Sequence, residues 1–390
     1  MASSTGISRA VWMLGFVSLF MDVSSELIHS LLPVFMVTSL GATALMVGAV
    51  EGVAEATALI VKVFSGTISD WIGRRKGLTV LGYGLGAISK PVFALALTVH
   101  WVFAARFMDR IGKGIRGAPR DALIADLTPP EIRGAAYGLR QSLDTVGAFV
   151  GPLLAVGLMI LWAGDFRAVF WFAVIPAVLS VVILVFGVHE PQAGRAAARP
   201  SSPVHWGSLS EFSSAYWWIV AAGGIFTLAR FSEAFLILRA QQLGLADSYA
   251  PLVLVIMNVV YAASAFPSGR LADRVRHTKL LAAGLAVLIL ADIVLAQAQS
   301  LVAVAAGVVL WGLHMGMTQG LLATMVAGTA PAHLRGTAFG FFNLVSGIAL
   351  LVASVLAGLL WDQLGSAVTF YAGAAFSVLA LAVLMLRRRS

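Results

Sequence analysis

The stretch GTISDWIGRRK at residues 66–76 returns as GRLADRVRH at residues 269–277, with a glycine, an aspartate four positions later and a basic cluster recurring at an offset of 203 residues. A second stretch, PEIRGAAYG at residues 130–138, returns as PAHLRGTAFG at residues 331–340, and its Arg-Gly pair is displaced by 202 residues. Two matching pairs at nearly the same offset indicate that the chain consists of two similar halves.

The composition is that of a membrane protein. Hydrophobic residues make up 59% of the 390 residues and charged residues 11%, against roughly 45–50% and 25% in soluble domains. Lipid offers the backbone no hydrogen-bond partners, and each crossing needs about 20 apolar residues, so the long apolar runs are predicted to be helices. The first run, from Val11 to about Thr38, is too long for the core of a signal peptide, so we expect it to be retained.

Breaks in hydropathy predict twelve spans. Their limits lie near residues 11–38, 45–68, 77–98, 101–124, 136–161, 167–188, 214–238, 249–269, 278–297, 300–325, 337–360 and 365–386. Six spans per copy give the two copies the same orientation in the membrane. The expected fold class is therefore an all-α polytopic membrane protein, with twelve transmembrane helices in two parallel six-helix halves.

The halves are expected at residues 1–188 and 214–390, joined by a polar, proline-containing cytoplasmic linker at residues 189–213. Basic residues cluster on the even-numbered loops and at the C-terminus: Arg74, Arg75, Lys76, Arg133, Arg195, Arg199, Arg270, Arg274, Arg276, Lys279, Arg335 and Arg387 to Arg389. Because positive loops stay on the cytoplasmic side, we expect a bacterial-type inner-membrane protein with both termini in the cytoplasm. These clusters also account for the net charge of +8, so nucleic-acid binding is not predicted.

Ionisable residues inside the spans are the main functional signal, because each costs at least a few kcal/mol in the bilayer unless it is paired or hydrated. In the first span Asp22, Glu26 and His29 fall at i, i+4 and i+7 and share one helix face. The second span carries a similar stripe: Glu51, Glu55 and Lys62. The fourth span has the largest positive excess: Arg106, Asp109, Arg110, Lys113, Arg116, Arg120 and Asp121. The opposite excesses predict that these spans pair, either as a permanent ion-pair lattice or as groups whose protonation changes.

The second half carries fewer charges. Arg230 and Glu233 lie three residues apart in the seventh span, where they can neutralise each other or contact a substrate. Tyr261, His314 and Gln319 are polar groups of the eighth and tenth spans that could line a cavity. A single histidine on an apolar helix is more often a packing residue, which is the alternative for His314.

Three motifs resemble those of the major facilitator superfamily. Residues 66–76 match its loop between the second and third helices, and Arg110-x-x-Lys113-Gly114-x-x-Gly117 resembles its helix 4 motif. Gly147-x-x-x-Gly151-Pro152 resembles the helix 5 motif of its proton antiporters. The chain therefore resembles the major facilitator superfamily over its whole length, and its helix 5 motif resembles that of the twelve-helix proton-antiporter branch, which exports drugs and metabolites.

The resemblance implies a secondary transporter, not an enzyme, that works by alternating access around a central site. It also implies a cytoplasmic gate, formed by Gly66, Asp70, Gly73, Arg74, Asp273 and Arg274. The helix 5 motif would seal the two halves against a proton leak, with simple helix packing as the alternative. The ninth span, which carries Asp292, is placed outside the cavity.

If the first and fourth spans face the cavity, as the resemblance implies, Asp22 and Arg110 lie at similar depth near the midplane. Dry surroundings favour the neutral carboxyl and an adjacent guanidinium favours the carboxylate, so a change of access or substrate can load or release a proton. We therefore expect Asp22 or Glu26 to carry the coupling proton and Arg110 to tune it. The expected substrate-binding residues are His29, Glu55, Lys113, Arg230, Glu233, Tyr261, His314 and Gln319.

The leading hypothesis is proton-coupled export of a small molecule by a monomer without a resident metal or cofactor. The main alternative is uptake of an anionic solute by proton symport, with Arg110, Lys113 and Arg230 as ligands of the anion. Export of a metal ion or chelate held by the acid and histidine stripe of the first span is another. A receptor or scaffold that transports nothing is the alternative from a different class. The sequence has no P-loop, zinc-protease or nucleophile-elbow motif, so ATP-driven transport and enzyme chemistry are not predicted.

Overall fold

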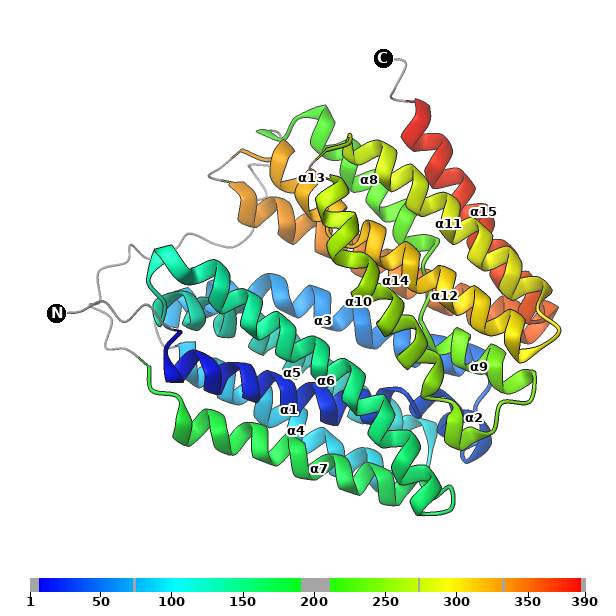
Figure 1. The fold of residues 1–390 in the computed structure, drawn as a ribbon, viewed down its shortest axis with the longest axis horizontal. Helices are drawn as coiled ribbons and strands as arrows, with labels where there is room; N and C mark the ends of the chain where they lie inside the picture. The colour runs from blue at the N-terminus through cyan, green and yellow to red at the C-terminus, as the bar shows by residue number, and fades with distance from the viewer. Residues whose placement is uncertain (1–6, 73–74, 191–210, 273, 332–333, 387–390) are drawn as a thin grey trace. The chain divides into compact units, whose positions relative to one another are not determined.

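The computed structural model describes residues 7–72, 75–190, 211–272, 274–331 and 334–386, and every regular element in those ranges is a helix. The main helices, shown in Figure 1, are α1 (Arg9–His29), α2 (Leu32–Thr38), α3 (Ala44–Ile72), α4 (Arg75–Ala94), α5 (Val99–Asp126), α6 (Arg133–Leu161), α7 (Phe166–Val182), α8 (Ser214–Leu228), α9 (Ala234–Gln242), α10 (Leu252–Ala272), α11 (His277–Gln297), α12 (Leu301–Thr318), α13 (Leu321–Thr329), α14 (Arg335–Leu364) and α15 (Ser366–Leu386). Short helical turns cover Pro130–Ile132, Ile183–Gly187 and Asp247–Tyr249.

These helices form twelve spans at the predicted positions, because three of the spans are divided in two. The first span consists of α1 and α2, the seventh of α8 and α9, and the tenth of α12 and α13. Nine spans in the described part of the chain are long and apolar enough to cross a membrane by those criteria alone. The other three are α4, the highly charged α5 and the divided α8–α9 span. The predicted all-α polytopic fold is confirmed.

The breaks in the first and seventh spans have local causes. Pro33 has no N–H to donate to the carbonyl of His29, so the helical hydrogen-bond ladder stops there. Between α8 and α9 the N–H of Ser232 donates to Ser354 Oγ at 3.2 Å, so a side chain takes the place of the helical partner. The two breaks recur at the offset of the sequence repeats, which places them at equivalent points of the two halves.

The chain divides into two compact units. Unit 1 holds α1, the second part of α3 from Ile60, and α4 to α7; unit 2 holds α2, the first part of α3 up to Leu59, and α8 to α15. Helix α3 therefore contributes to both units. The predicted linker at residues 189–213 falls mainly within residues 191–210, outside the described residues, so the boundary between the predicted halves stays a prediction.

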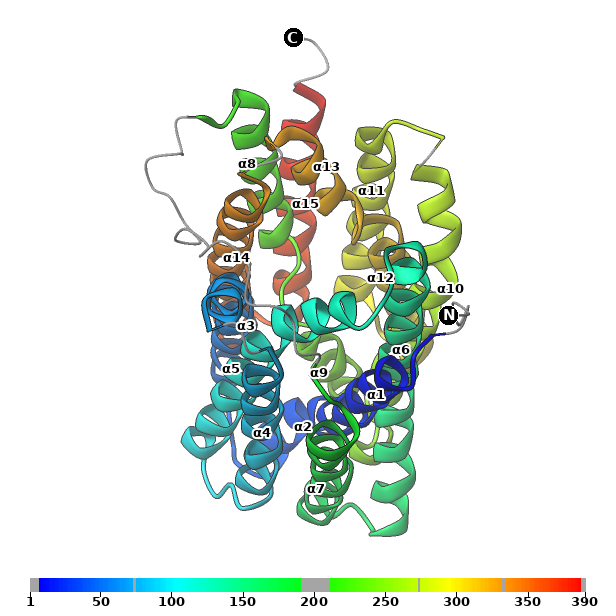
Figure 2. The ribbon, with the colours of Figure 1, turned by 90° about the vertical axis from the view of Figure 1, so that its left-hand side faces the viewer.

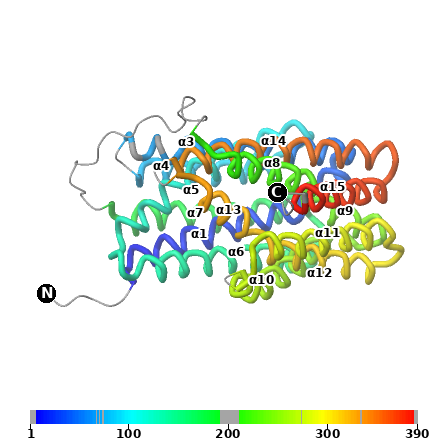
Figure 3. Tube along the Cα trace, turned by 90° about the horizontal axis from the view of Figure 1, so that it is seen from above, coloured from blue at the N-terminus to red at the C-terminus, as the bar shows by residue number. Residues whose placement is uncertain are grey.

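In unit 1, α1 packs against α6 and α7, and α4 packs against α5 and α7, as Figures 1 and 3 show. Buried apolar residues of these helices, among them Val17, Met21 and Tyr83, form the core. In unit 2, α11 packs between α12 and α15, and α14 packs against α8 and α15 (Figure 2). The core of each unit therefore lies between its helices. The ionisable side chains of the candidate site lie at the edge of these cores or inside them.

Candidate functional site

The acidic face of α1 lies against the glycines of α6. Asp22 and Glu26 are half-buried on α1. A Cβ at Gly147 would lie 2.9 Å from Asp22 Cβ, a Cβ at Gly151 would lie 2.9 Å from Glu26 Cβ, and each would come within 2.8 Å of the α1 backbone. Only glycine permits so close an approach. The predicted proton-carrying acids and the predicted helix 5 motif, including the buried Pro152, thus meet in one place, which we call the α1–α6 seam.

Glu26 is paired with His29, the last residue of α1. His29 Nδ1 lies 3.3 Å from Glu26 Oε2, one helical turn away, and both side chains are only partly exposed. Because α1 ends at His29, the pair sits at the break that Pro33 makes in the first span. A carboxyl and an imidazole in contact at a helix end can take up or pass on a proton.

The cations that act electrostatically on the Asp22 carboxyl come from α5. Four charged groups of unit 1 act electrostatically on its carboxyl: Lys113, Arg116, Arg120 and Asp144. Lys113 is exposed, whereas Arg116 is buried and its guanidinium lies 4.7 Å from the centre of the Tyr83 ring. The cations of the fourth span thus act on the acidic face of the first span within unit 1, and their direct pairing stays a prediction.

Arg110, predicted to tune Asp22, has another carboxylate beside it. Its Nε lies 3.6 Å from Asp109 Oδ2, and both side chains are buried. Arg110 and Lys113 also act electrostatically on Glu26. Arg110 therefore lies beside Asp109 and acts on Glu26, and its expected role in tuning Asp22 stays a prediction.

The sequence-based reasoning missed the ion pair between Lys90 and Asp109. Lys90 Nζ, only 1% exposed, donates to Asp109 Oδ1 at 2.8 Å and to Ser25 Oγ at 2.9 Å. Arg106 Nη1 lies 4.0 Å from the other oxygen of Asp109, so this carboxylate is surrounded by Lys90, Arg106 and Arg110. The available signal was a lysine in the otherwise apolar third span, since such a charge needs a partner.

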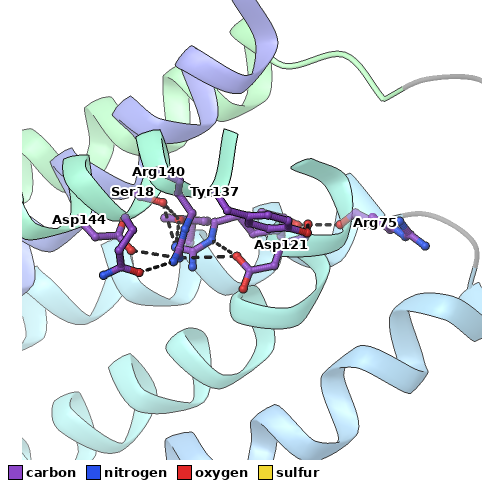
Figure 4. Close-up of polar contacts among 10 residues, drawn as sticks. Ser18, Arg75, Asp121, Tyr137, Arg140 and Asp144 are labelled. Atoms are coloured by element: carbon purple, nitrogen blue, oxygen red, sulfur yellow. Dashed lines mark hydrogen bonds and ion pairs between the residues drawn. The ribbon is translucent and has the colours of Figure 1, made fainter. Parts of the chain in front are cut away.

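A second ion-pair network joins α5 to α6 (Figure 4). Arg140 Nη1 lies 3.0 Å from Asp144 and 3.6 Å from Asp121, and Arg120 Nε lies 3.2 Å from Asp121. The hydroxyl of Tyr137 donates to the carbonyl oxygen of Asp121 at 2.8 Å. Because Asp144 and Arg120 also act on Asp22, the network connects electrostatically to the acids of α1.

In unit 2 the predicted site residues gather at the break between α8 and α9. Arg230 and Glu233 are half-buried in that non-helical stretch. Glu233 and Tyr261 act electrostatically on Arg230, whose guanidinium lies 5.9 Å from the centre of the Phe226 ring. Mutual neutralisation of Arg230 and Glu233 and contact with a substrate both stay predictions.

The remaining predicted substrate residues differ in exposure. His314 is fully buried on α12, and its Nδ1 lies 2.8 Å from the carbonyl oxygen of Gly284, which orients the ring; its role as a substrate residue stays a prediction. Gln319 is exposed at the break between α12 and α13. Glu55 is half-buried in the part of α3 that belongs to unit 2.

Most of the predicted cytoplasmic gate cannot be placed. Gly73, Arg74 and Asp273 lie outside the described residues, as does the side chain of Asp70. Gly66 lies on α3, where a Cβ would meet Ala118 Cβ of α5 at 3.4 Å. The exposed Arg274 lies two residues after the end of α10. The gate stays a prediction.

The described residues include an anchor beside the predicted gate. The Glu190 carboxylate accepts from the backbone N–H groups of Arg75 and Lys76, at 2.6 and 3.4 Å. The side chain of Arg75 also contacts Asp126, at the end of α5. These contacts hold the first turn of α4 to the ends of α5 and α7.

The chain is similar to known transporters in both sequence and fold. The family model of the Major Facilitator Superfamily matches residues 14–237 and 230–390. An uncharacterized MFS-type transporter of Methanocaldococcus jannaschii is 29% identical over 381 residues, which are 96% of this chain and 93% of that protein. The multidrug resistance protein MdtH of Edwardsiella ictaluri is 31% identical over 144 residues, which are 37% of this chain and 35% of that protein. A crystal structure of the nucleoside transporter NupG has a similar fold, with a TM-score of 0.80, 13% identity, and coverage of 97% of this chain and 99% of that one.

Proposed function

The chain belongs to the Major Facilitator Superfamily and is a membrane transporter, not an enzyme, and from this premise we propose that it exports a small molecule in exchange for protons, which Asp22 and Glu26 carry. The observation that carries the proposal is the α1–α6 seam. Gly147 and Gly151 bring the backbone of α6 against the two turns of α1 that bear these acids. Because α6 and α1 are closely packed along the seam, a change in the charge or hydration of either carboxyl is expected to alter how α1 packs against α6.

The exchange follows from competition for the same carboxylates. When Asp22 and Glu26 are ionised, they are attracted by the cations of α5 and can bind a cationic or amphiphilic substrate. When they are protonated, that attraction is lost and the substrate is released. Proton and substrate therefore lower each other's affinity, which is the thermodynamic requirement for antiport.

The transport direction and the substrate class are argued from a relative and from the charges of the site. MdtH of Edwardsiella ictaluri, which is similar to part of this chain, is called a multidrug resistance protein, and this favours export of amphiphilic compounds. Of the three cations expected to bind an anion in symport, Arg110 has Asp109 beside it and Arg230 lies near Glu233, which disfavours anion symport, while Lys113 is exposed. Metal export would need a donor cluster, and no group of three or more His, Asp or Glu side chains suited to a metal ion occurs within the described ranges.

The test is the internal pH of proteoliposomes under an imposed proton gradient. We expect lipophilic cations to release protons from vesicles that contain the protein. Asp22→Asn or Glu26→Gln should abolish the release, because neither amide can carry the proton.

The control is Asp247→Asn, since Asp247 lies in a short helical turn after α9 and its carboxylate accepts from Gln241. This variant should behave as wild type. Proton uptake only with organic anions would replace the proposal by symport, and retention of coupling in both acid variants would reject the role of the α1–α6 seam.

A further inference from the structure

Asp292 of α11 is a buried carboxyl to which the transport mechanism above gives no role. Its residue exposure is 0%, and neither carboxyl oxygen has a hydrogen-bond partner within the described part of the chain. An ionised carboxylate in such surroundings is strongly disfavoured, because nothing replaces the water it has lost. The side chain is therefore neutral in this state, which means that it holds a proton.

The surroundings of Asp292 are apolar and aromatic. A Cβ at Gly373 of α15 would lie 2.8 Å from Asp292 Oδ2 and 2.9 Å from Phe231 Cε1, so the carboxyl and this ring meet over the same glycine. The Phe231 ring centre lies 5.5 Å from those of Trp311 and Phe370. The carboxyl is shielded from water, and Phe231, which lies beside it over Gly373, belongs to the break between α8 and α9.

No cation of the described residues forms an ion pair with Asp292, although α11 is surrounded by helices that carry ionisable groups. On α12, His314 is directed to the carbonyl of Gly284. On α9, Arg239 donates to the carbonyls of Leu295, Ala296 and Ala298. The other ionisable groups on packed elements are Tyr371 of α15, Tyr261 and Arg270 of α10, and Arg230 and Glu233 at the break.

We propose that Asp292 is a second proton-binding site of the transporter, which keeps its proton while the Phe231 ring covers it and loses it when the α8–α9 break rearranges. In the release step the Oδ–H bond breaks, the proton passes to water that reaches the uncovered carboxyl, and the electron pair stays on the carboxylate. Deprotonation then favours the uncovered state by linkage. The inference requires a transporter that changes state, but not the export direction proposed above.

The first test is infrared difference spectroscopy of the purified full-length protein in lipid. The C=O stretching band of a protonated carboxyl should be present in the wild type at neutral pH and absent in Asp292→Asn. Asp247→Asn is the control and should keep the band. If Asp292→Asn does not fold, Gly373→Ala assigns the band to Asp292 instead. The new alanine methyl group would press on Asp292 Oδ2 and shift the band without removing it.

The second test follows the break itself. The sequence contains no cysteine, so a single Ser232→Cys reports the accessibility of the α8–α9 break to a maleimide. Labelling, normalised to that of a single Ser248→Cys in the short helical turn after α9, should rise several-fold as the pH is raised and should stay flat in the Asp292→Asn background.

A missing infrared band in the wild type overturns the inference, as does an unchanged pH response of Ser232→Cys labelling in Asp292→Asn. Neither result affects the export assay. Loss of proton exchange only in the Asp22 and Glu26 variants supports the proposed function, and absence of exchange in the wild type rejects it. In either case the infrared band of Asp292 is expected to remain.

Discussion

Asp109 is the residue on which the charge balance of unit 1 depends most. Its carboxylate lies within 4.0 Å of nitrogen atoms of Lys90, Arg106 and Arg110, and all four side chains are buried. Removing one cation leaves Asp109 with others beside it. Removing the carboxylate leaves several buried cations without this partner.

We therefore expect Asp109→Ala to lower the free energy of unfolding by about 3–5 kcal/mol, the range for breaking a buried ion pair. Lys90→Ala should cost less, because Asp109 keeps Arg110. Thermal unfolding of the purified protein measures both effects. The control is Asp247→Ala, in the short helical turn after α9, and an Asp109→Ala variant as stable as that control would contradict the expected dependence.

At the scale of elements, the α1–α6 seam determines how closely the proton-carrying face of α1 is held. The Cβ of any residue at Gly151 would come 2.8 Å from the carbonyl oxygen of Val23, whereas a Cβ at Gly157 on the same helix would meet nothing within 4 Å. The two glycines therefore differ in whether α6 touches α1.

We expect Gly151→Ala to cost about 1–3 kcal/mol through overpacking and to reduce proton-coupled transport, because Glu26 is displaced. Gly157→Ala is the matched control and should leave both properties unchanged. Transport in proteoliposomes and thermal unfolding are measured in parallel. Equal effects of the two substitutions would show that the seam has no special role.

The contact between α3 and α14 within unit 2 is a second element-scale feature. Asp362 accepts from the N–H groups of Ala44 and Leu45, at 3.0 and 2.9 Å, and so caps the start of α3. Beside it, a Cβ at Gly358 would lie 2.5 Å from the Ala44 carbonyl oxygen. The predicted topology places this contact at the outer end, where it would hold that end closed.

Asp362→Ala removes an N-cap, which costs about 0.5–2 kcal/mol. If this energy biases the opening of the outer end, labelling of a single Ala44→Cys by an impermeable maleimide should rise about 2- to 30-fold. Asp362→Asn keeps one acceptor and should give a smaller rise. Unchanged labelling in Asp362→Ala would show that the cap does not control opening.

At the scale of the whole molecule, the distribution of basic loops predicts the orientation in the membrane. A single Ser248→Cys, between the seventh and eighth spans, should react with an impermeable maleimide in intact cells. A single Arg276→Cys, between the eighth and ninth spans, should react only after permeabilisation. The cysteine-free parent is the control, and the reverse pattern would invert the predicted topology.

The fold was largely predictable because its signals are local in the sequence. Apolar runs gave the twelve spans, and two repeated motifs gave the two halves. The three broken spans were not predicted, although Pro33 was a visible signal for the first break. The break at Ser232 depends on Ser354, more than a hundred residues away, so no local pattern indicated it.

The sequence by itself determined the membrane class, the repeat, the acidic stripe of Asp22 and Glu26 and the basic surplus of the fourth span. Only the tertiary structure decided the partners: Lys90 and Arg110 for Asp109, the glycines of α6 for the acidic stripe, and no cation of the described residues for Asp292. The reason is that helical periodicity gives the face on which a residue lies, whereas the rotation of each helix and its register against its neighbours are set by packing between segments far apart in the chain.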